Sequence, residues 1–316
     1  MIKMSAGTAH VLGFKQLSID ALPTTAYLMS GEKCAHDCAF CPQARNASAK
    51  TNLLSRVTWS EGSLREIAAA IGQAYSQGLL QRACLQVVDG DNVLAGVKEA
   101  VGQIKACSRI PVSVSVRLTK PEEVLVLAGS GVDRIGLALD AAAETAFKSV
   151  KTGGWQQTLS IIKEAARLLP GRISTHLIAG LGETEQEMVT MMQHMHDLGV
   201  TVGLFAFTPV PGTKMARHAP PGLAGYRRLQ AANYLIGKKI VNAQNFIFNS
   251  GKLIYYGLAE AELRAYLING RAFQTSGCPG CNRPYYNEKP GGTIYNYPRP
   301  LTAAEAAAAL EGVLNG

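Results

Sequence analysis

The sequence predicts an α/β fold: a parallel TIM-type (βα) barrel, in a closed (βα)8 form or a slightly open (βα)6 form. Strand-like runs alternate with helix-like segments through most of the 316 residues, and no Ser- or Pro-rich linker or sequence repeat interrupts them. Hydrophobic residues make up 47% of the chain, enough for one large core. Because parallel strands are joined by right-handed crossovers, this alternation most simply curls the sheet into a barrel.

The first half of the chain supplies four of the expected strands. Runs of apolar and β-branched residues predict strands at 25–30, 82–88, 112–116 and 134–139. Helices are expected between them, at 60–77, 93–106 and 120–129. In the first helix Ser60 is a suitable N-cap, and Leu64, Ile67 and Ile71 recur at helical spacing.

The second half continues the alternation and then loses it. A helix broken at Gly153 and Gly154 precedes strands at 173–178, 202–207 and 245–248, with helices at 184–198, 222–237 and 259–269. From Gln274 the chain is rich in Gly, Pro, Tyr and Asn, and it ends in an Ala-rich helix near 302–314. We therefore assign residues 1–273 to the barrel and 274–316 to a C-terminal irregular extension of the same structural domain.

Composition narrows the class of protein. The sequence has no run of 18 or more apolar residues, and its first residues lack the apolar segment of a secretion signal, so we expect a cytoplasmic protein without a membrane partner. Seven clustered cysteines fit reduced thiols that hold metal better than a disulfide framework. The net charge of +8 is dispersed, which gives no support for nucleic-acid binding and is compatible with docking of an acidic protein.

Three of the cysteines, Cys34, Cys38 and Cys41, fall within eight residues after the first strand. Three thiolates this close repel one another unless a cation or cluster lies between them. Thiolate ligation points to zinc or iron–sulfur. A zinc site could take His36 as its fourth ligand, whereas a four-iron cluster would keep one iron open. Buried structural cysteines are the alternative that needs no metal.

With Phe40 beside the third cysteine, this motif resembles the signature of the radical S-adenosylmethionine (SAM) enzymes. The resemblance implies that Cys34, Cys38 and Cys41 hold a [4Fe-4S] cluster whose open iron binds SAM. One electron from the cluster would then cleave SAM to methionine and a 5′-deoxyadenosyl radical. It also implies an electron donor such as ferredoxin or flavodoxin.

The resemblance extends to residues at the ends of later strands, where a parallel barrel carries its chemistry. Asp140 matches a carboxylate that binds the SAM ribose, although it could instead cap the next helix. Ile178 is expected against the adenine, and the run 205–211, which contains Phe207, is expected to contact it through the backbone. Core packing and a tight turn at 180–183 are the alternatives. Phe40 and Gln86 complete the expected cofactor contacts.

Among radical SAM families, residues 20–270 resemble biotin synthase and its relatives most closely, through the segments 41–43, 177–184 and 208–213. In that family three cysteines and an arginine hold a second cluster inside the barrel. Cys84 matches the cysteine of the second strand. The other two cysteine positions fall within 112–116 and at Ser174, and the arginine position falls within 245–248, so those ligands are missing.

The C-terminal extension contains two cysteines that could replace the missing cluster ligands. Cys278 and Cys281 have the two-residue spacing that lets one cluster or metal bind both sulfurs, and Gly277 and Gly280 permit the turn. With Cys84 they would give an auxiliary iron–sulfur cluster, most simply [4Fe-4S], three thiolates. A zinc knuckle and a redox pair are the alternatives.

Ser174, His176 or a sulfide could supply the fourth ligand of this auxiliary cluster. Cys107 is expected to be structural.

A biotin synthase-like barrel with such a C-terminal segment resembles the archaeal-type, two-component lipoyl synthases. This implies sulfur insertion into an octanoyl chain on a lysine of a carrier protein or peptide, together with a homologous second radical SAM subunit. No catalytic side-chain base is required, and Arg117, Asn92 and Gln86 are expected to position substrate, or to serve as caps or ion-pair partners. Biotin synthase acting on desthiobiotin, another radical SAM reaction, and a non-catalytic iron–sulfur or zinc scaffold are the alternatives.

Overall fold

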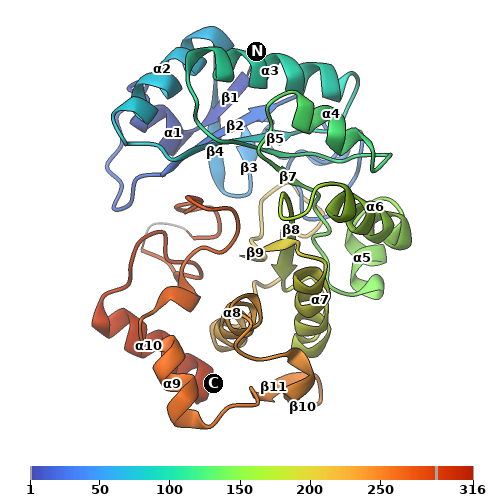
Figure 1. Cartoon of the computed structure of the whole chain (residues 1–316), viewed down its shortest axis with the longest axis vertical. Helices are drawn as coiled ribbons and strands as arrows, with labels where there is room; N and C mark the ends of the chain where they lie inside the picture. Colours follow the sequence, from blue (N-terminus) through green and yellow to red (C-terminus); the bar gives the residue numbers. More distant parts are fainter. Residues whose placement is uncertain (1, 289–290, 316) are drawn as a thin grey trace.

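The computed structural model describes residues 2–288 and 291–315, which fold around one curled sheet (Figure 1). Its nine strands lie in the order β3-β4-β1-β2-β5-β6-β7-β8-β9. The strands are β1 (Ile2–Ser5), β2 (Thr25–Ser30), β3 (Leu53–Leu54), β4 (Val57–Gly62), β5 (Arg82–Val87), β6 (Val112–Ser115), β7 (Arg134–Gly136), β8 (Ile173–Ala179) and β9 (Thr201–Ala206). The six strands β2, β5, β6, β7, β8 and β9 pair in parallel, whereas β1, β4 and β3 pair antiparallel at one edge.

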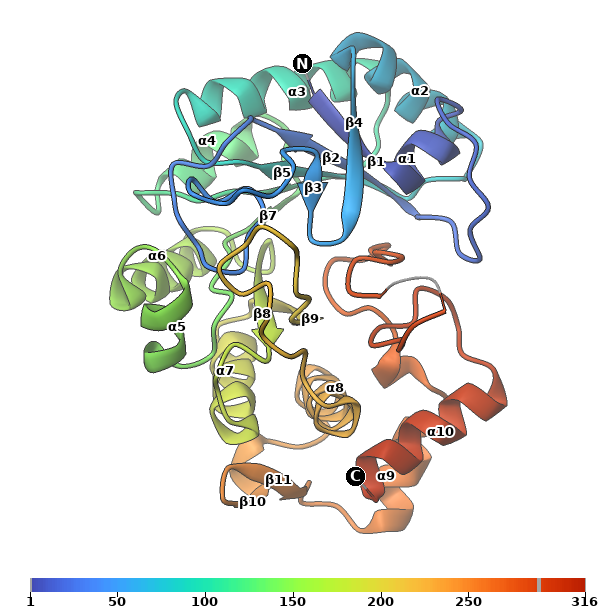
Figure 2. The ribbon, with the colours of Figure 1, turned by 180° about the vertical axis from the view of Figure 1, so that it is seen from behind.

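Helices α2 to α8 follow the parallel strands and cover the outside of the sheet (Figures 1 and 2). The helices are α1 (Ala6–Val11), α2 (Leu64–Ser76), α3 (Val93–Cys107), α4 (Glu123–Gly129), α5 (Glu144–Val150), α6 (Trp155–Leu168), α7 (Glu185–Asp197), α8 (Leu223–Gly237), α9 (Glu260–Leu267) and α10 (Ala303–Leu314), with short 3-10 turns η1 (Ala243–Asn245) and η2 (Arg271–Phe273). The helical spacing expected in the sequence places Ile67 and Ile71 of α2 in the core. The α/β class is therefore confirmed, in its open (βα)6 form.

Two element predictions were wrong. Ser60 does not cap a helix, because residues 57–62 form β4 and Ser60 pairs with Met4 of β1, so α2 begins only at Leu64. The segment 245–248 adds no strand to the barrel. Its end forms β10 (Ile247–Asn249), which pairs with β11 (Lys252–Tyr255) in a separate hairpin. Both segments are short, so their pattern of apolar and polar residues did not indicate which strand each would pair with.

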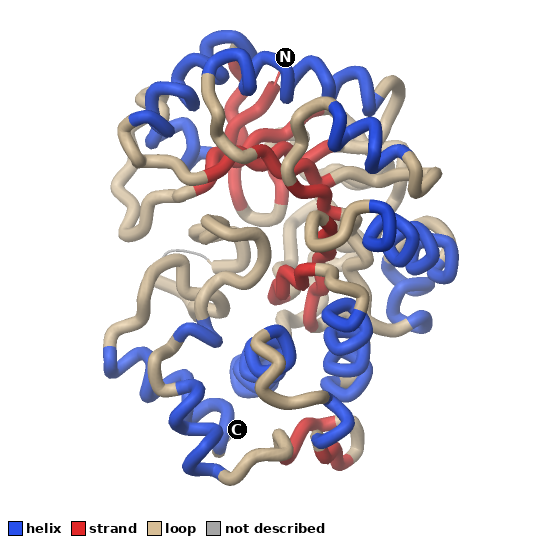
Figure 3. Tube along the Cα trace, in the orientation of Figure 1, coloured by secondary structure: helices blue, strands red, loops and turns tan. Residues whose placement is uncertain are grey.

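The sheet does not close on itself, and residues 274–288 and 291–299, here called the tail, lie across its opening (Figure 3). On the β9 side, Leu204 N donates to Ser276 Oγ at 2.9 Å, and Asn287 Nδ2 donates to Ala206 O at 2.7 Å. On the β2 side, Thr25 Oγ1 donates to Gly280 O at 2.7 Å. The tail thus satisfies the free edge of β9 that a closing strand would otherwise pair.

The far end of the tail is fixed to α8. The guanidinium of Arg227 donates to Tyr295 O and Ile294 O, both at 2.6 Å, and lies 5.2 Å from the centre of the Tyr297 ring. Helix α10 then packs beside α8, with Leu310 buried. In the described part of the chain, no helix has the length and apolar character needed to cross a membrane.

Candidate functional site

The cysteine loop, residues 31–50, leaves the C-terminal end of β2. Its own backbone hydrogen bonds hold the thiols: Cys34 N donates to Gln43 O at 2.9 Å, and Cys41 N donates to Cys38 O at 3.1 Å. Gly31 opens the loop with φ +88°, and a Cβ there would lie 2.9 Å from a backbone oxygen after β5. Only glycine fits this approach without a shift. The loop brings Cys34, Cys38 and Cys41 to one cavity.

This set of donors suits an iron–sulfur cluster. Burial, with smaller contributions from the neighbouring Cys38 and Cys34, raises the pKa of the Cys41 thiol to about 12. Burial also raises the pKa of Cys38. Such thiols ionise when a positively charged centre replaces the missing water. Within the described ranges, no group of His, Cys, Asp or Glu side chains is arranged to hold a single metal ion, whereas a cluster binds each sulfur through a different iron and suits wider spacing.

His36, the residue that a zinc site would need, has another partner. Its Nε2 lies 2.7 Å from Asp89 Oδ2, and each of the two side chains is 25% exposed. The pairing is reinforced by the backbone, since Ala35 N donates to Asp89 O at 2.9 Å. The imidazole therefore ties the cysteine loop to the segment after β5, which argues against zinc ligation by His36.

Two cavities meet inside the barrel. The loop cavity, about 370 Å³, is lined by the loop cysteines and the ends of β5, β6 and β7. The tail cavity, about 190 Å³, lies between the sheet and the tail. Six residues line both: Phe40, Cys41, Leu54, Gln86, Ser115 and Asp140. The two cavities are thus neighbouring parts of one largely apolar interior.

Asp140 lies at the boundary between the cavities. It does not cap α5, because that helix begins at Glu144 with Ala143 as its N-cap, so the capping alternative is wrong. Instead its carboxylate pairs with Lys151 Nζ at 2.7 Å, and both side chains are largely buried. Lys151 also donates to Leu139 O at 3.2 Å. Sequence reasoning missed Lys151, because no motif marks a lysine at the end of a helix as an inward-facing charge.

The other expected cofactor contacts also face this interior. Phe40 and Gln86 line both cavities, whereas Ile178 and Phe207 line the tail cavity. The turn after Ile178 has a local explanation, since the Glu183 carboxylate accepts hydrogen bonds from backbone amides within the turn, at 2.7 and 3.0 Å. The structure thus places all four side chains at the site and accounts for the glutamate as a turn-closing residue.

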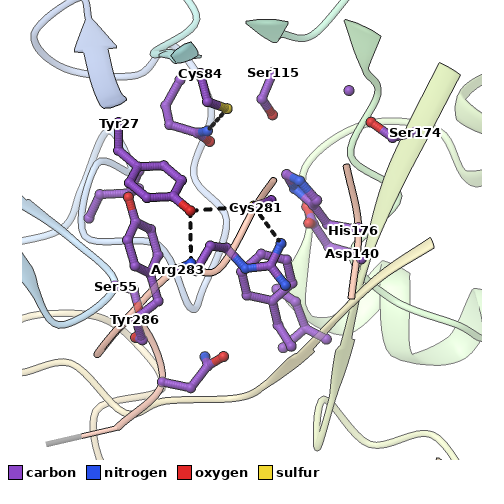
Figure 4. Close-up of a pocket in the computed structure, with 18 of the residues that line it drawn as sticks. Tyr27, Ser55, Cys84, Ser115, Asp140, Ser174, His176, Cys281, Arg283 and Tyr286 are labelled. Carbon is purple, nitrogen blue, oxygen red and sulfur yellow. Dashed lines mark hydrogen bonds between the residues drawn. The ribbon is translucent and has the colours of Figure 1, made fainter. Parts of the chain in front are cut away.

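A second group of three thiols lines the tail cavity. Two of them, Cys84 and Cys281, are labelled in Figure 4. Cys84 lies on β5, and Cys278 and Cys281 reach it from the tail. Burial raises the pKa of the Cys84 thiol, and nearby Cys281 and Cys278 raise it further. Gly277 and Gly280 have φ of +129° and +76°, as the expected turn requires. The structure therefore joins cysteines almost 200 residues apart in the sequence.

Arg283 is a site residue that sequence reasoning missed. The family's arginine position falls within 245–248, a segment that contains no arginine and ends in the outer hairpin. The tail instead places the Arg283 guanidinium 4.0 Å from the centre of the Phe205 ring, with Nη1 3.7 Å from Cys281 Sγ. Its position two residues after Cys281 was the only available signal. The tail thus brings both thiols and a cation to the cavity.

The candidates for a fourth auxiliary ligand lie nearby. Cys278 Sγ is 3.9 Å from Ser174 Oγ. His176 lines the same cavity edge-on to Phe205, and burial lowers its pKa to about 4, so its imidazole is neutral near pH 7. Either side chain has an electron pair available for a metal, and the alternatives stay open.

Three other predicted positions differ in their placement. Arg117 lines the loop cavity and donates to Thr152 O at 2.9 Å. Asn92 stands at the N-cap of α3 but makes no side-chain capping bond, and it lines neither cavity. Cys107, expected to be structural, is exposed at the end of α3 and is not a core residue. Of these three residues, only Arg117 lines a cavity of the candidate site.

The site thus consists of an open (βα)6 barrel with three thiols at the end of its first parallel strand. Residues 28–195 match the model of the Radical SAM superfamily. This chain belongs to the Radical SAM superfamily, which implies a [4Fe-4S] cluster and SAM as cofactors.

The curated relatives are biotin synthases of low identity. That of Persephonella marina is 25% identical over 240 residues, covering 74% of this chain and 65% of the relative. That of Mycobacterium tuberculosis is 26% identical over 189 residues, covering 58% and 51%. The chain is thus biotin synthase-like, and it spans between half and two thirds of the length of these relatives.

Solved structures support the fold. HydG, a maturase of the [FeFe]-hydrogenase, superimposes with a TM-score of 0.54 at 13% identity, covering 73% of this chain and 52% of that one. Methylornithine synthase superimposes with a TM-score of 0.52 at 12% identity, covering 73% and 65%. At these identities the likeness concerns the barrel and not the reaction.

Proposed function

We propose that this protein is a radical SAM sulfur-insertion enzyme, a lipoyl synthase component that acts on an octanoyl-lysine chain. The observation that carries the proposal is the meeting of Cys84 with Cys278 and Cys281 at one cavity, beside the cavity of the cysteine loop. One centre would generate the radical, and the other would supply sulfur. Both would be needed within reach of one substrate carbon.

The chain's own residues would organise the two centres. Cys34, Cys38 and Cys41 would hold the cluster that binds SAM, and Cys84, Cys278 and Cys281 would hold an auxiliary cluster, most simply [4Fe-4S]. When bound, these groups would supply a radical that abstracts hydrogen from an unactivated carbon, and a sulfide that replaces it. Reactions of this kind need close positioning and exclusion of water.

Side chains at the boundary would place SAM and substrate. Asp140, largely buried and already bound to Lys151, would accept hydrogen bonds from the ribose, and Ile178 and Phe207 would pack against apolar groups. Phe40 and Gln86, which line both cavities, would hold the reacting carbon between the centres. An apolar cavity of this kind suits the methylene chain of an octanoyl group.

Partners would follow from the same chemistry. The octanoyl group would arrive on a carrier protein or peptide, with a homologous radical SAM subunit sharing the two sulfur insertions. Seven free thiols suit the reducing cytoplasm, where we place the protein.

A basic surface near the cysteine loop supports docking of an acidic electron carrier such as ferredoxin or flavodoxin. Segments 31–56 and 208–221 pack together, since Ser48 N donates to Gly212 O at 2.9 Å. They carry six basic residues, namely Lys33, Arg45, Lys50, Arg56, Lys214 and Arg217, against two acidic residues, Glu32 and Asp37. Half of the chain's net charge of +8 thus belongs to the segment that carries the proposed electron-accepting cluster and to the segment packed against it.

Biotin synthase is the second candidate, favoured by the names of the curated relatives. Desthiobiotin, like an octanoyl chain, presents unactivated methylene or methyl carbons. The two functions separate in one experiment: reconstituted protein, SAM and reductant are incubated with an octanoyl-lysyl peptide or with desthiobiotin, alone and with any homologous subunit. Mass spectrometry of a sulfur-containing octanoyl peptide supports the proposal, and sulfur gained only by desthiobiotin contradicts it.

A further inference from the structure

Tyr27 joins the sheet to the tail at the second group of thiols (Figure 4). It belongs to β2, where it pairs in register with Cys84 on β5. Its side chain is only 2% exposed, and its hydroxyl lies 3.4 Å from Cys281 Sγ. The strand that delivers the cysteine loop therefore also contacts a sulfur of the tail.

The hydroxyl has three partners, and together they fix the direction of its proton. The backbone amides of Asn282 and Arg283 donate to it, at 3.2 and 2.8 Å. A tyrosine hydroxyl has two acceptor positions and one proton. Both acceptor positions are filled, so the proton is directed to the remaining partner, Cys281 Sγ.

Tyr286, a second buried tyrosine, lies beside Tyr27. The neighbouring ring of Tyr286, 5.3 Å away between ring centres, provides a contrast, because its buried hydroxyl has no hydrogen-bond partner among the described residues. Of these two neighbouring tyrosines, only Tyr27 binds the Cys278–Cys281 turn through its hydroxyl.

We propose that Tyr27 is a positioning residue for Cys281: its hydroxyl fixes the turn that carries this sulfur and donates a hydrogen bond to the sulfur itself. Cys84 has a comparable donor in Gln86, whose Nε2 lies 3.0 Å from Cys84 Sγ. The proposal rests on the proposed auxiliary cluster. Hydrogen bonds to ligating sulfurs disperse their negative charge and ease reduction of an iron–sulfur cluster.

The test uses full-length protein in which Cys34, Cys38 and Cys41 are all replaced by Ala, so that only the auxiliary cluster can form. Tyr27→Phe removes the hydroxyl but keeps the ring. The matched control is Tyr256→Phe, which removes another buried hydroxyl; that hydroxyl donates to Arg228 O at 3.2 Å, and its ring packs against Phe246, next to the outer hairpin. Two quantities are measured: the midpoint potential of the reconstituted cluster, and hydrogen exchange at the amides of Asn282 and Arg283 in metal-free protein.

Tyr27→Phe should lower the midpoint potential and speed exchange of the two amides about fivefold or more, as expected for one lost hydrogen bond. Tyr256→Phe should change neither quantity. An unchanged potential or unchanged exchange in Tyr27→Phe overturns the proposal. If the parent triple variant binds no cluster, the proposed function has failed instead, and the exchange experiment still decides whether Tyr27 anchors the turn.

Discussion

The cysteine loop and the tail are both irregular segments that present closely spaced thiols to the same interior, yet they are held in different ways. The turns that carry the loop thiols are closed by the loop's own backbone, as in the bond from Cys34 N to Gln43 O. The tail is stabilised by side chains that reach distant strands, as in the bond from Asn287 Nδ2 to Ala206 O. A site built from local bonds can be recognised from spacing, whereas one built from distant contacts becomes visible only in the fold.

The largest effect should follow from damage to the loop. Cys38→Ala should abolish formation of 5′-deoxyadenosine and remove about four irons per chain, because one thiolate of three is lost from the SAM-binding cluster. Iron analysis and chromatography of the reaction products measure both. The control is Cys107→Ala, which changes an exposed thiol outside the site. Continued SAM cleavage by Cys38→Ala would contradict the assignment of the SAM-binding cluster to the loop cysteines.

Damage to the tail should give a narrower defect. Cys281→Ala should still cleave SAM but yield no sulfur-containing product, because the auxiliary centre loses one of its three thiolates. Assaying 5′-deoxyadenosine and product in the same reaction separates the two steps. If Cys281→Ala forms neither 5′-deoxyadenosine nor the sulfur-containing product, the loop and the tail act as one functional unit. The division of roles between them would then be wrong.

The Asp140–Lys151 pair tests the region where the loop cavity and the tail cavity meet. Asp140→Ala should weaken SAM binding by about 1.5–3 kcal/mol, the range for a hydrogen bond to a charged group. It should also reduce the free energy of unfolding by about 3 kcal/mol, because it leaves the Lys151 ammonium buried without its carboxylate.

The double variant Asp140→Ala, Lys151→Met distinguishes these two roles. It should recover much of the stability in urea unfolding without recovering SAM affinity in calorimetry. Recovery of both would assign Asp140 a structural role alone.

A smaller effect should come from the tail's polar anchors. Asn282→Ala removes hydrogen bonds to Leu22 O at 2.8 Å, to Pro298 O at 3.2 Å and from Thr24 N at 3.0 Å. The tail should loosen by about 1–3 kcal/mol, measured as faster proteolysis of residues 274–299. The control Asn269→Ala changes an exposed asparagine outside the tail. Equal proteolysis of the two variants would contradict the account of tail anchoring.

The smallest effect concerns pH and has opposite signs in the two segments. Lys214 and Asn46 lower the pKa of loop residue Asp37 to about 2, so its stabilising contribution is present above pH 3.8 and is lost as the pH falls toward 2. Burial raises the pKa of tail residue Glu288, so the folded tail binds a proton more tightly than the unfolded chain. The stability of the folded tail should therefore fall as the pH rises above 4.5.

Glu288→Gln should remove this slope in proteolysis of the tail measured between pH 4.5 and 7. An unchanged slope in Glu288→Gln would assign the pH dependence to another group. Asp37→Asn, measured over pH 2–4, gives the opposite comparison for the loop.

The limits of prediction from the sequence follow the same division. The alternating periodicity and the CxxxCxxC spacing depend on neighbouring residues, so the open barrel and the cysteine group could be predicted. Lys151, Arg283 and Tyr27 could not, because each acquires its role from a partner on another element. The β4 strand was missed for the same reason, since its pairing with β1 joins segments some 55 residues apart.

The most direct test of the central claim, two separate thiolate centres in one chain, is an iron and sulfide count with Mössbauer spectroscopy on anaerobically reconstituted protein. We expect about eight irons in the unmodified chain, and about four when either Cys34, Cys38 and Cys41 or Cys84, Cys278 and Cys281 are replaced by Ala. Four irons in the unmodified chain, or zinc bound by the tail cysteines, would contradict the claim.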